Sequence, residues 1–215
     1  MFQKRDVKHF NLMVRISKIP ENIQKRRVRM TPLATLKDHV SKIILQYGHH
    51  PGKTPEEAAY FYIGEPEEVS PGVHFFTSIG NSTTFVCNDR IMQVDCNGVM
   101  RSQAIIDAIR ERTDKPFDTL VISHGHPDHC LGTIHYIKDN EKRGFSRPRV
   151  IAHRNLRKRF DRYNLLESHR KGTNKTQFQV DMQHPDVFVY ADTEFEDRLE
   201  VTVGGEVFLI LLKKE

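Results

Sequence analysis

Short apolar runs, separated by turn-forming residues, dominate the chain from residue 71 onward. Their length and their content of β-branched and aromatic residues predict strands at 73–77, 83–87, 91–94, 119–122, 150–152, 187–190, 199–203 and 206–212. Apolar residues at three- and four-residue steps instead predict helices at 101–112, 131–137 and 154–171, followed by a polar loop at 172–186. This alternation of strands and helices favours a layered α/β architecture.

The first 70 residues show a different pattern. Apolar residues repeat at helical spacing between the Thr31-Pro32 start signal and Gly48, so we expect an amphipathic helix there. A second short helix is expected from residue 54, where the sequence resembles a capping box. Residues 1–70 are therefore interpreted as a basic N-terminal extension with two short helices, and residues 71–215 as the main domain.

Charge is distributed unevenly along the chain. The first 31 residues hold nine Lys or Arg against two acidic residues, which leaves 24 basic and 26 acidic residues in the remainder. We expect residues 1–30 to be a solvated, partly disordered arm. The alternatives are nucleic-acid or anionic-membrane binding through Lys25-Arg26-Arg27-Val28-Arg29, and mitochondrial targeting.

Other features bear on the compartment. No apolar run approaches the roughly 18 residues that a membrane span requires. The three cysteines are odd in number and include no Cys-x-x-Cys pair, which favours a reducing, cytoplasmic compartment.

The candidate chemistry lies in the loop after the strand predicted at 119–122, which reads Ser-His-Gly-His-Pro-Asp-His. In an extended segment residues two apart face the same way, so His124 and His126 can offer both imidazoles to one metal ion. Pro127 helps to turn the chain into the following helix. That turn brings Asp128 and His129 back to the same pocket, where they can hold a second ion. Imidazole and carboxylate ligands suit zinc, with iron or manganese as alternatives.

This stretch resembles the His-x-His-x-Asp-His signature of the metallo-β-lactamase superfamily, and the likeness covers roughly residues 71–215. Residues 80–87 and 91–95 look like the opening hairpin of that fold, which ends in a buried Asp near the metals. The hairpin match implies that Asp95 orients a metal ligand through a hydrogen bond without binding the ion itself. Residues 150–153, the Arg-rich helix to Tyr163-Asn164 and residues 174–178 are similar to a branch related to alkyl sulfatases.

The resemblance implies a partial αββα sandwich and a zinc-dependent hydrolase that cleaves an ester-type bond in a small molecule. It implies a two-metal site, with Asp128 positioning an ion or the attacking water, and with these metal ligands: His124, His126, Asp128 and His129. It does not identify the substrate-binding residues.

Relatives add further ligands after the strand that matches 206–212, whereas this sequence ends at Glu215. We therefore expect a truncated first half with little or no activity, and an open sheet edge through which the chain self-associates. The alternative is a non-enzymatic product that binds nucleic acid through the basic arm.

Overall fold

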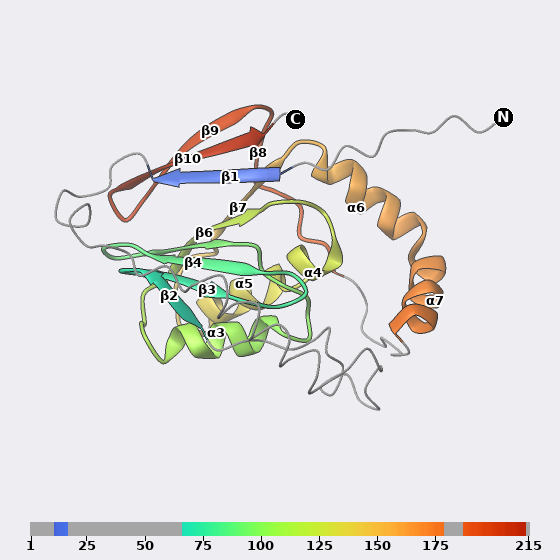
Figure 1. Ribbon diagram of the computed structural model, residues 1–215, viewed down its shortest axis with the longest axis horizontal. Helices are drawn as coiled ribbons and strands as arrows, with labels where there is room; N and C mark the ends of the chain where they lie inside the picture. The colour runs from blue at the N-terminus through green and yellow to red at the C-terminus, as the bar shows by residue number, and fades with distance from the viewer. Residues whose placement is uncertain (1–10, 17–65, 179–186, 214–215) are drawn as a thin grey trace, which may run out of the picture.

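The computed structural model describes residues 11–16, 66–178 and 187–213, which form two sheets and a set of helices (Figure 1). The strands are β1 (Asn11–Ile16), β2 (Glu67–Ser70), β3 (Val73–Phe76), β4 (Ser82–Val86), β5 (Ile91–Val94), β6 (Phe117–Ile122), β7 (Arg149–His153), β8 (Thr193–Phe195), β9 (Arg198–Val203) and β10 (Glu206–Lys213). The helices are α3 (Ser102–Arg110), α4 (Pro127–Cys130), α5 (Thr133–Lys142), α6 (Leu156–Leu165) and α7 (Glu167–Phe178).

The larger sheet has seven strands in the order β2-β3-β4-β5-β6-β7-β8. Strands β2 to β5 pair antiparallel, as a meander, whereas β5 to β8 pair parallel and are joined by crossovers that contain the helices. The carboxyl ends of parallel strands lie at one edge of a sheet. Residues that follow β5, β6 and β7 therefore meet at that edge.

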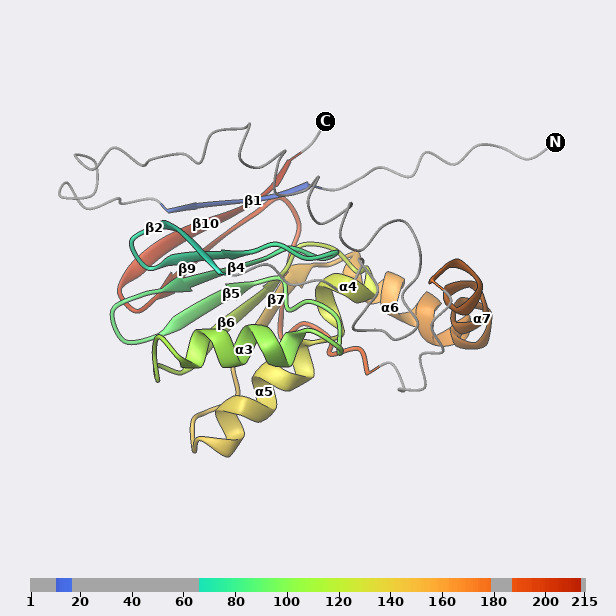
Figure 2. The ribbon, with the colours of Figure 1, turned by 60° about the horizontal axis from the view of Figure 1, so that its bottom comes forward.

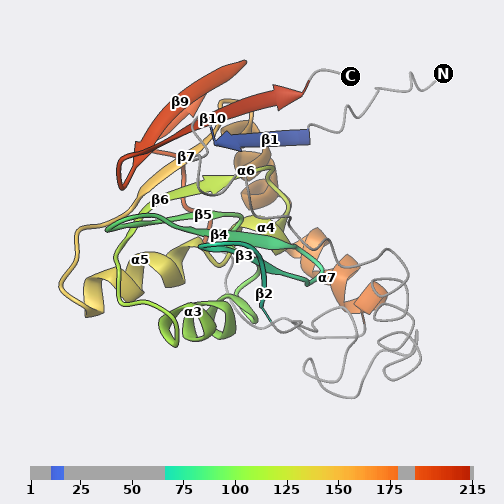
Figure 3. The ribbon, with the colours of Figure 1, turned by 60° about the vertical axis from the view of Figure 1, so that its left-hand side comes forward.

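The central strands are buried on both faces. Leu120 and Ile122 of β6 belong to the cluster that packs against α3 and α5, whereas Val121 between them packs with Phe208 of the smaller sheet. Figures 2 and 3 show α3 and α5 covering the face of the large sheet that is turned away from the small sheet. Burial on both faces explains why these strands read as continuous apolar runs. The observed layers are helices, sheet and sheet, as expected for a partial αββα sandwich.

The smaller sheet has three antiparallel strands in the order β1-β10-β9. Its register runs from Asn11 opposite Lys213 to Ile16 opposite Phe208. Phe208 and Ile210 are fully buried against the large sheet. Strand β10 has a partner on each side, whereas β9 lies at the edge of the small sheet and β8 at the edge of the large sheet. Self-association through an edge formed by the strands after residue 187 stays a prediction.

Two strands lie within the stretch that was expected to be an extension. Asn11–Ile16 forms β1, so this part of the basic arm belongs to a sheet and the expectation of a free arm was wrong there. Glu67–Ser70 forms β2 at one edge of the large sheet. The helices predicted near 31–48 and 54–62 lie outside the described residues, and the division of the chain at residue 70 stays a prediction.

Most predicted elements of the main domain are confirmed, with two exceptions after β7. The strand expected at 187–190 is absent, and β8 forms instead at Thr193–Phe195. Phe188 packs on the rings of Phe160 and Tyr163, so its apolar character serves a contact with α6 and not a sheet. The expected loop at 172–186 was also wrong in its first part, because α7 continues to Phe178.

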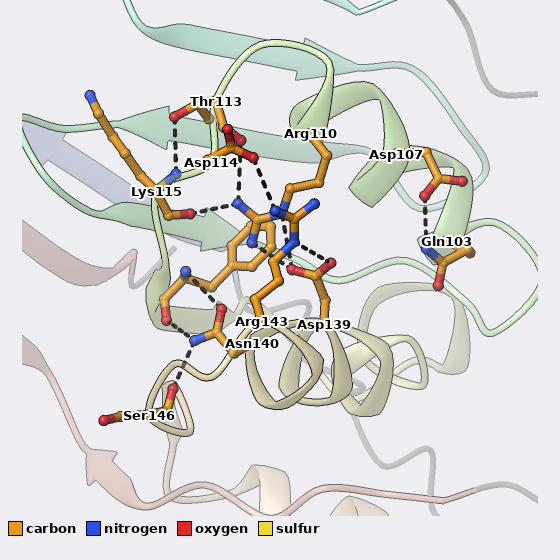
Figure 4. A network of polar contacts seen from close by, with 11 residues as sticks. Gln103, Asp107, Arg110, Thr113, Asp114, Lys115, Asp139, Asn140, Arg143 and Ser146 are labelled. Atoms are coloured by element: carbon orange, nitrogen blue, oxygen red, sulfur yellow. Dashed lines mark hydrogen bonds and ion pairs between the residues drawn. The ribbon is translucent and has the colours of Figure 1, made fainter.

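A polar network fixes α3 and α5 to the start of β6 (Figure 4). Arg110 of α3 donates from Nη2 and Nε to one carboxylate oxygen of Asp139 on α5, at 2.5 and 3.0 Å. Its guanidinium also lies 4.6 Å from the centre of the Phe117 ring. The Asn140 side chain accepts the Phe117 N–H and donates to the carbonyls of Phe117 and Ser146. The network thereby anchors the strand that leads into the candidate metal loop.

Candidate metal centre

The loop predicted to bind metal follows β6 at the carboxyl edge of the large sheet. His126 has an extended backbone and lies just before α4, and Pro127 occupies the first helical turn. Asp128 and His129 lie in that turn, as the sequence predicts. The change from extended to helical backbone brings the side chains on both sides of Pro127 into one cluster.

Asp95 is the buried acceptor at the centre of this cluster. It lies one residue beyond β5 with a left-handed backbone, at φ 57°. Its Oδ1 accepts the Ser123 N–H at 2.7 Å, and its Oδ2 accepts the Ser123 hydroxyl at 2.6 Å. Oδ2 also lies 2.8 Å from Nδ1 of His129. Since a carboxylate only accepts, Nδ1 of His129 carries a proton, and in the neutral form of the ring Nε2 keeps its lone pair.

The four predicted ligands approach one another in two pairs, and each pair brings two metal-binding atoms (donor atoms) close together. Nε2 of His124 lies 3.0 Å from Nδ1 of His126. Nε2 of His129 lies 3.4 Å from Oδ2 of Asp128. The rings of His124 and His129 are also in contact, with centroids 4.0 Å apart. Within the described ranges, however, no group of three or more His, Cys, Asp or Glu side chains is arranged to hold a metal ion.

The donor types fit zinc, and so does the protonation state of His124. Burial, followed by the positive charges of His129 and His126, lowers the pKa of His124 to about 4. Burial also acts to lower the pKa of His129, but its hydrogen bond to Asp95 and the charges of Asp95 and Asp128 outweigh burial and raise it. A neutral His124 at pH 7 needs to release no proton before it binds a metal.

The metal-free chain is expected to lose stability as the pH falls from 6.5 toward 4. The pKa of His124 is lower in the folded chain than its ordinary value of 6.5. The unfolded chain therefore binds more protons in this range, and the stabilisation present above pH 6.5 is lost as the pH falls through the folded value. Denaturant unfolding in a chelator at several pH values measures this loss. We expect His124→Asn to flatten it; an undiminished loss in that variant would contradict the assignment.

Several residues fix the position of the loop without being candidate metal ligands, and the His-x-His-x-Asp-His motif did not identify them. A Cβ on Gly80 would lie 1.9 Å from the carbonyl oxygen of Asp128, and one on Gly132 would lie 2.1 Å from that of Cys96. Asn97 has a left-handed backbone, with φ 59°. Its side chain donates to the Gly80 carbonyl and accepts the Gly98 N–H. The Asn-Gly pair after Asp95 was the available sequence signal, because Asn and Gly tolerate left-handed and turn backbones.

Other candidates from the sequence lie outside the cluster. The ring of His153, at the end of β7, packs edge-on against Phe195, and its Nδ1 accepts the Asn155 N–H. All three cysteines are free and buried. The basic run 25–29 and His49-His50 lie outside the described residues. Among the helices that the structure describes, none has the length and apolar character needed to cross a membrane.

No protein-family model matches this sequence, and no curated protein matches it. Among solved structures, the stereoselective inverting sec-alkylsulfatase of Pseudomonas sp. aligns with 66% of the chain at 16% identity, with a TM-score of 0.54. A double mutant of a sec-alkylsulfatase aligns with 78% at 18% identity, with a TM-score of 0.55. A subclass B3 metallo-β-lactamase of Bradyrhizobium japonicum aligns with 69% at 15% identity, with a TM-score of 0.48.

The chain spans only part of these proteins: 26% and 28% of the two alkylsulfatase chains, and 51% of the lactamase chain. At identities this low, the likeness to the two alkylsulfatase structures establishes the fold alone. The described residues therefore form part of a metallo-β-lactamase fold.

Proposed function

We propose that this chain is a metallo-β-lactamase-like hydrolase domain whose site binds zinc. The two donor pairs on the loop after β6 carry this proposal. His124 and His126 would hold one ion through Nε2 and Nδ1, and Asp128 and His129 would hold a second. Iron and manganese are the alternatives that the same donor types accept.

The protein side chains have distinct tasks in this proposal. Bound zinc would supply a water whose pKa is lowered from 15.7 to about 7. Asp95 fixes the ring of His129 and the start of the loop, so that two elements of the site keep their positions. The carboxylate of Asp128, which is partly exposed, would orient the attacking water and accept its proton. The proposed substrate is a small molecule with an ester-type bond, as the fold relatives suggest.

The pairwise arrangement limits how much activity we expect. A catalytic zinc site uses three protein ligands and a water. Within the described part of the chain the donors converge only in twos. We therefore propose that these residues bind zinc weakly, and that rapid turnover requires additional donors to complete the coordination.

Zinc titration of the chain tests the proposal. Binding should be detectable by calorimetry or by competition with a weak chelator. Replacing His124 and His126 together with alanine should reduce it below detection, because one donor pair is removed entirely. The matched control replaces His49 and His50 with alanine, which removes the same number of imidazoles and should leave zinc binding unchanged. Equal losses in both double variants would indicate general adsorption to histidine and would contradict a specific site.

Hydrolysis is measured separately with sulfate, carboxyl, thiol and phosphate esters, in the presence of zinc or manganese. We expect little or no turnover from this chain. Sustained multiple turnover that disappears in His124→Ala would show that the expectation of low activity is wrong, while it would support the assignment of the site.

A further inference from the structure

The basic residues of α6 differ in their partners. Arg157 pairs with Glu194 of β8 at 3.1 Å, and Arg154, just before the helix, pairs with Glu196 at 2.7 Å. These two ion pairs attach the start of α6 to the edge of the large sheet. The charges of Arg154 and Arg157 are thereby neutralised by carboxylates within the fold.

Arg159 instead lies against the candidate metal loop. A Cβ on Gly125, between His124 and His126, would come within 2.8 Å of Cγ of Arg159 and 3.0 Å of Leu156. Glycine at position 125 thus permits α6 to lie directly on the loop. The stem of Arg159 is in contact with the segment that carries the first donor pair.

An aromatic residue holds the charged end of Arg159. Its guanidinium lies 4.8 Å from the centre of the Tyr163 ring and donates to the Tyr163 hydroxyl at 2.8 Å. Arg170 of α7 lies over the same ring at 5.7 Å, so two cations share one tyrosine. Among the residues that the structure describes, no carboxylate forms an ion pair with Arg159. A cation in this position, without a carboxylate partner, is suited to a planar, two-point contact with an anion.

Given the proposed function, on which this inference rests, we propose that Arg159 binds an anionic group of the substrate beside the metal loop. The recognised chemistry is that of a phosphate, a sulfate or a carboxylate, each of which offers two oxygens to the N–H groups of a guanidinium. Tyr163 is the positioning residue that holds the guanidinium, while the stem of Arg159 lies against the loop.

Titration of the full chain with inorganic phosphate, sulfate or acetate tests this inference, and the three anions distinguish the possible sources of the group. The key variant is Arg159→Met, which keeps an unbranched stem against Gly125 and removes the charge. We expect it to weaken anion binding by about tenfold or more, since a charge-assisted, two-point contact is lost. Arg159→Lys retains the charge without the planar fork, and we expect intermediate binding.

The matched control is Arg157→Met, which removes an ion-paired cation from the same helix and should leave anion binding unchanged. Circular dichroism confirms that each variant is folded. Anion binding by Arg159→Met at the wild-type level, or an equal loss in Arg157→Met, would overturn the inference.

The outcome is separable from that of the metal proposal. The double variant His124→Ala, His126→Ala should no longer bind zinc. In the presence of a chelator, its anion binding should still depend on Arg159. Anion binding that is Arg159-dependent in a chain that takes up no zinc would support this inference and contradict the metal proposal. Zinc uptake together with anion binding that is unchanged in Arg159→Met would support the metal proposal and contradict this inference.

Discussion

Replacing Gly80 with alanine is expected to destabilise the fold and to abolish zinc binding. The added Cβ would lie 1.9 Å from the Asp128 carbonyl oxygen and 2.6 Å from its carbonyl carbon. These are backbone atoms, so they cannot rotate away as a flexible side chain does. The Gly80 backbone cannot withdraw freely either, since its carbonyl accepts a hydrogen bond from the buried side chain of Asn97. Overpacking of this kind costs about 1–3 kcal/mol or more.

Denaturant unfolding and zinc titration measure both effects of Gly80→Ala. Gly172→Ala in α7 is the matched control, because nothing lies within 4 Å of its Cβ position. That change should leave zinc binding intact and stabilise the helix by up to about 1 kcal/mol. Wild-type stability and zinc affinity in Gly80→Ala would show that α4 does not rest on Gly80 as described.

Removing the charge of Asp139 is the second change with a large expected effect. Only 7% of the Arg110 side chain and 12% of the Asp139 side chain are exposed, so Asp139→Asn leaves a nearly buried guanidinium without its carboxylate. Loss of one partner from a buried pair costs about 3–5 kcal/mol. We expect a loss near the lower end of this range, because Arg110 keeps its hydrogen bonds to the Thr113 and Lys115 carbonyls.

Asp114→Asn provides a control of identical chemistry in the same network (Figure 4). Asp114 pairs with Arg143, but 89% of its side chain is exposed, so its loss should cost less than about 1 kcal/mol. Denaturant unfolding of both variants measures the two losses in the free energy of unfolding. Equal losses would mean that the Arg110–Asp139 pair contributes no more than a surface pair.

The sequence predicted the central strands and the metal loop because their signals are local. The apolar run of β6 and the Pro127 turn specify a strand, a loop and a helix start within a dozen residues. The same segment contains all four candidate ligands, so their meeting required no knowledge of distant contacts. Asp95 was predicted through the hairpin resemblance, and the structure brings it to His129 and Ser123.

The incorrect predictions concern contacts between distant parts of the chain. The apolar segment 11–16 lies within a strongly basic arm, and only its pairing with β10 makes it part of a sheet. The apolar and aromatic residues of 187–190 suggested a strand, but the ring of Phe188 packs on Phe160 and Tyr163 of α6. The close approaches at Gly80 and Gly125 were not predicted, because a close backbone approach leaves no mark in the sequence beyond the glycine itself.

The pairing of β1 with β10 has a consequence for biosynthesis. Asn11 pairs with Lys213, 202 positions later, so the small sheet cannot close until Lys213 has left the ribosome. At about 5–20 residues per second, β1 would wait roughly 10–40 s for its partner strand. An unpaired strand on a nascent chain invites pairing with its neighbours on the same polysome. The nine basic residues among the first 31 would make such nascent segments repel one another, so we expect the charge of the arm to oppose aggregation of the emerging strand.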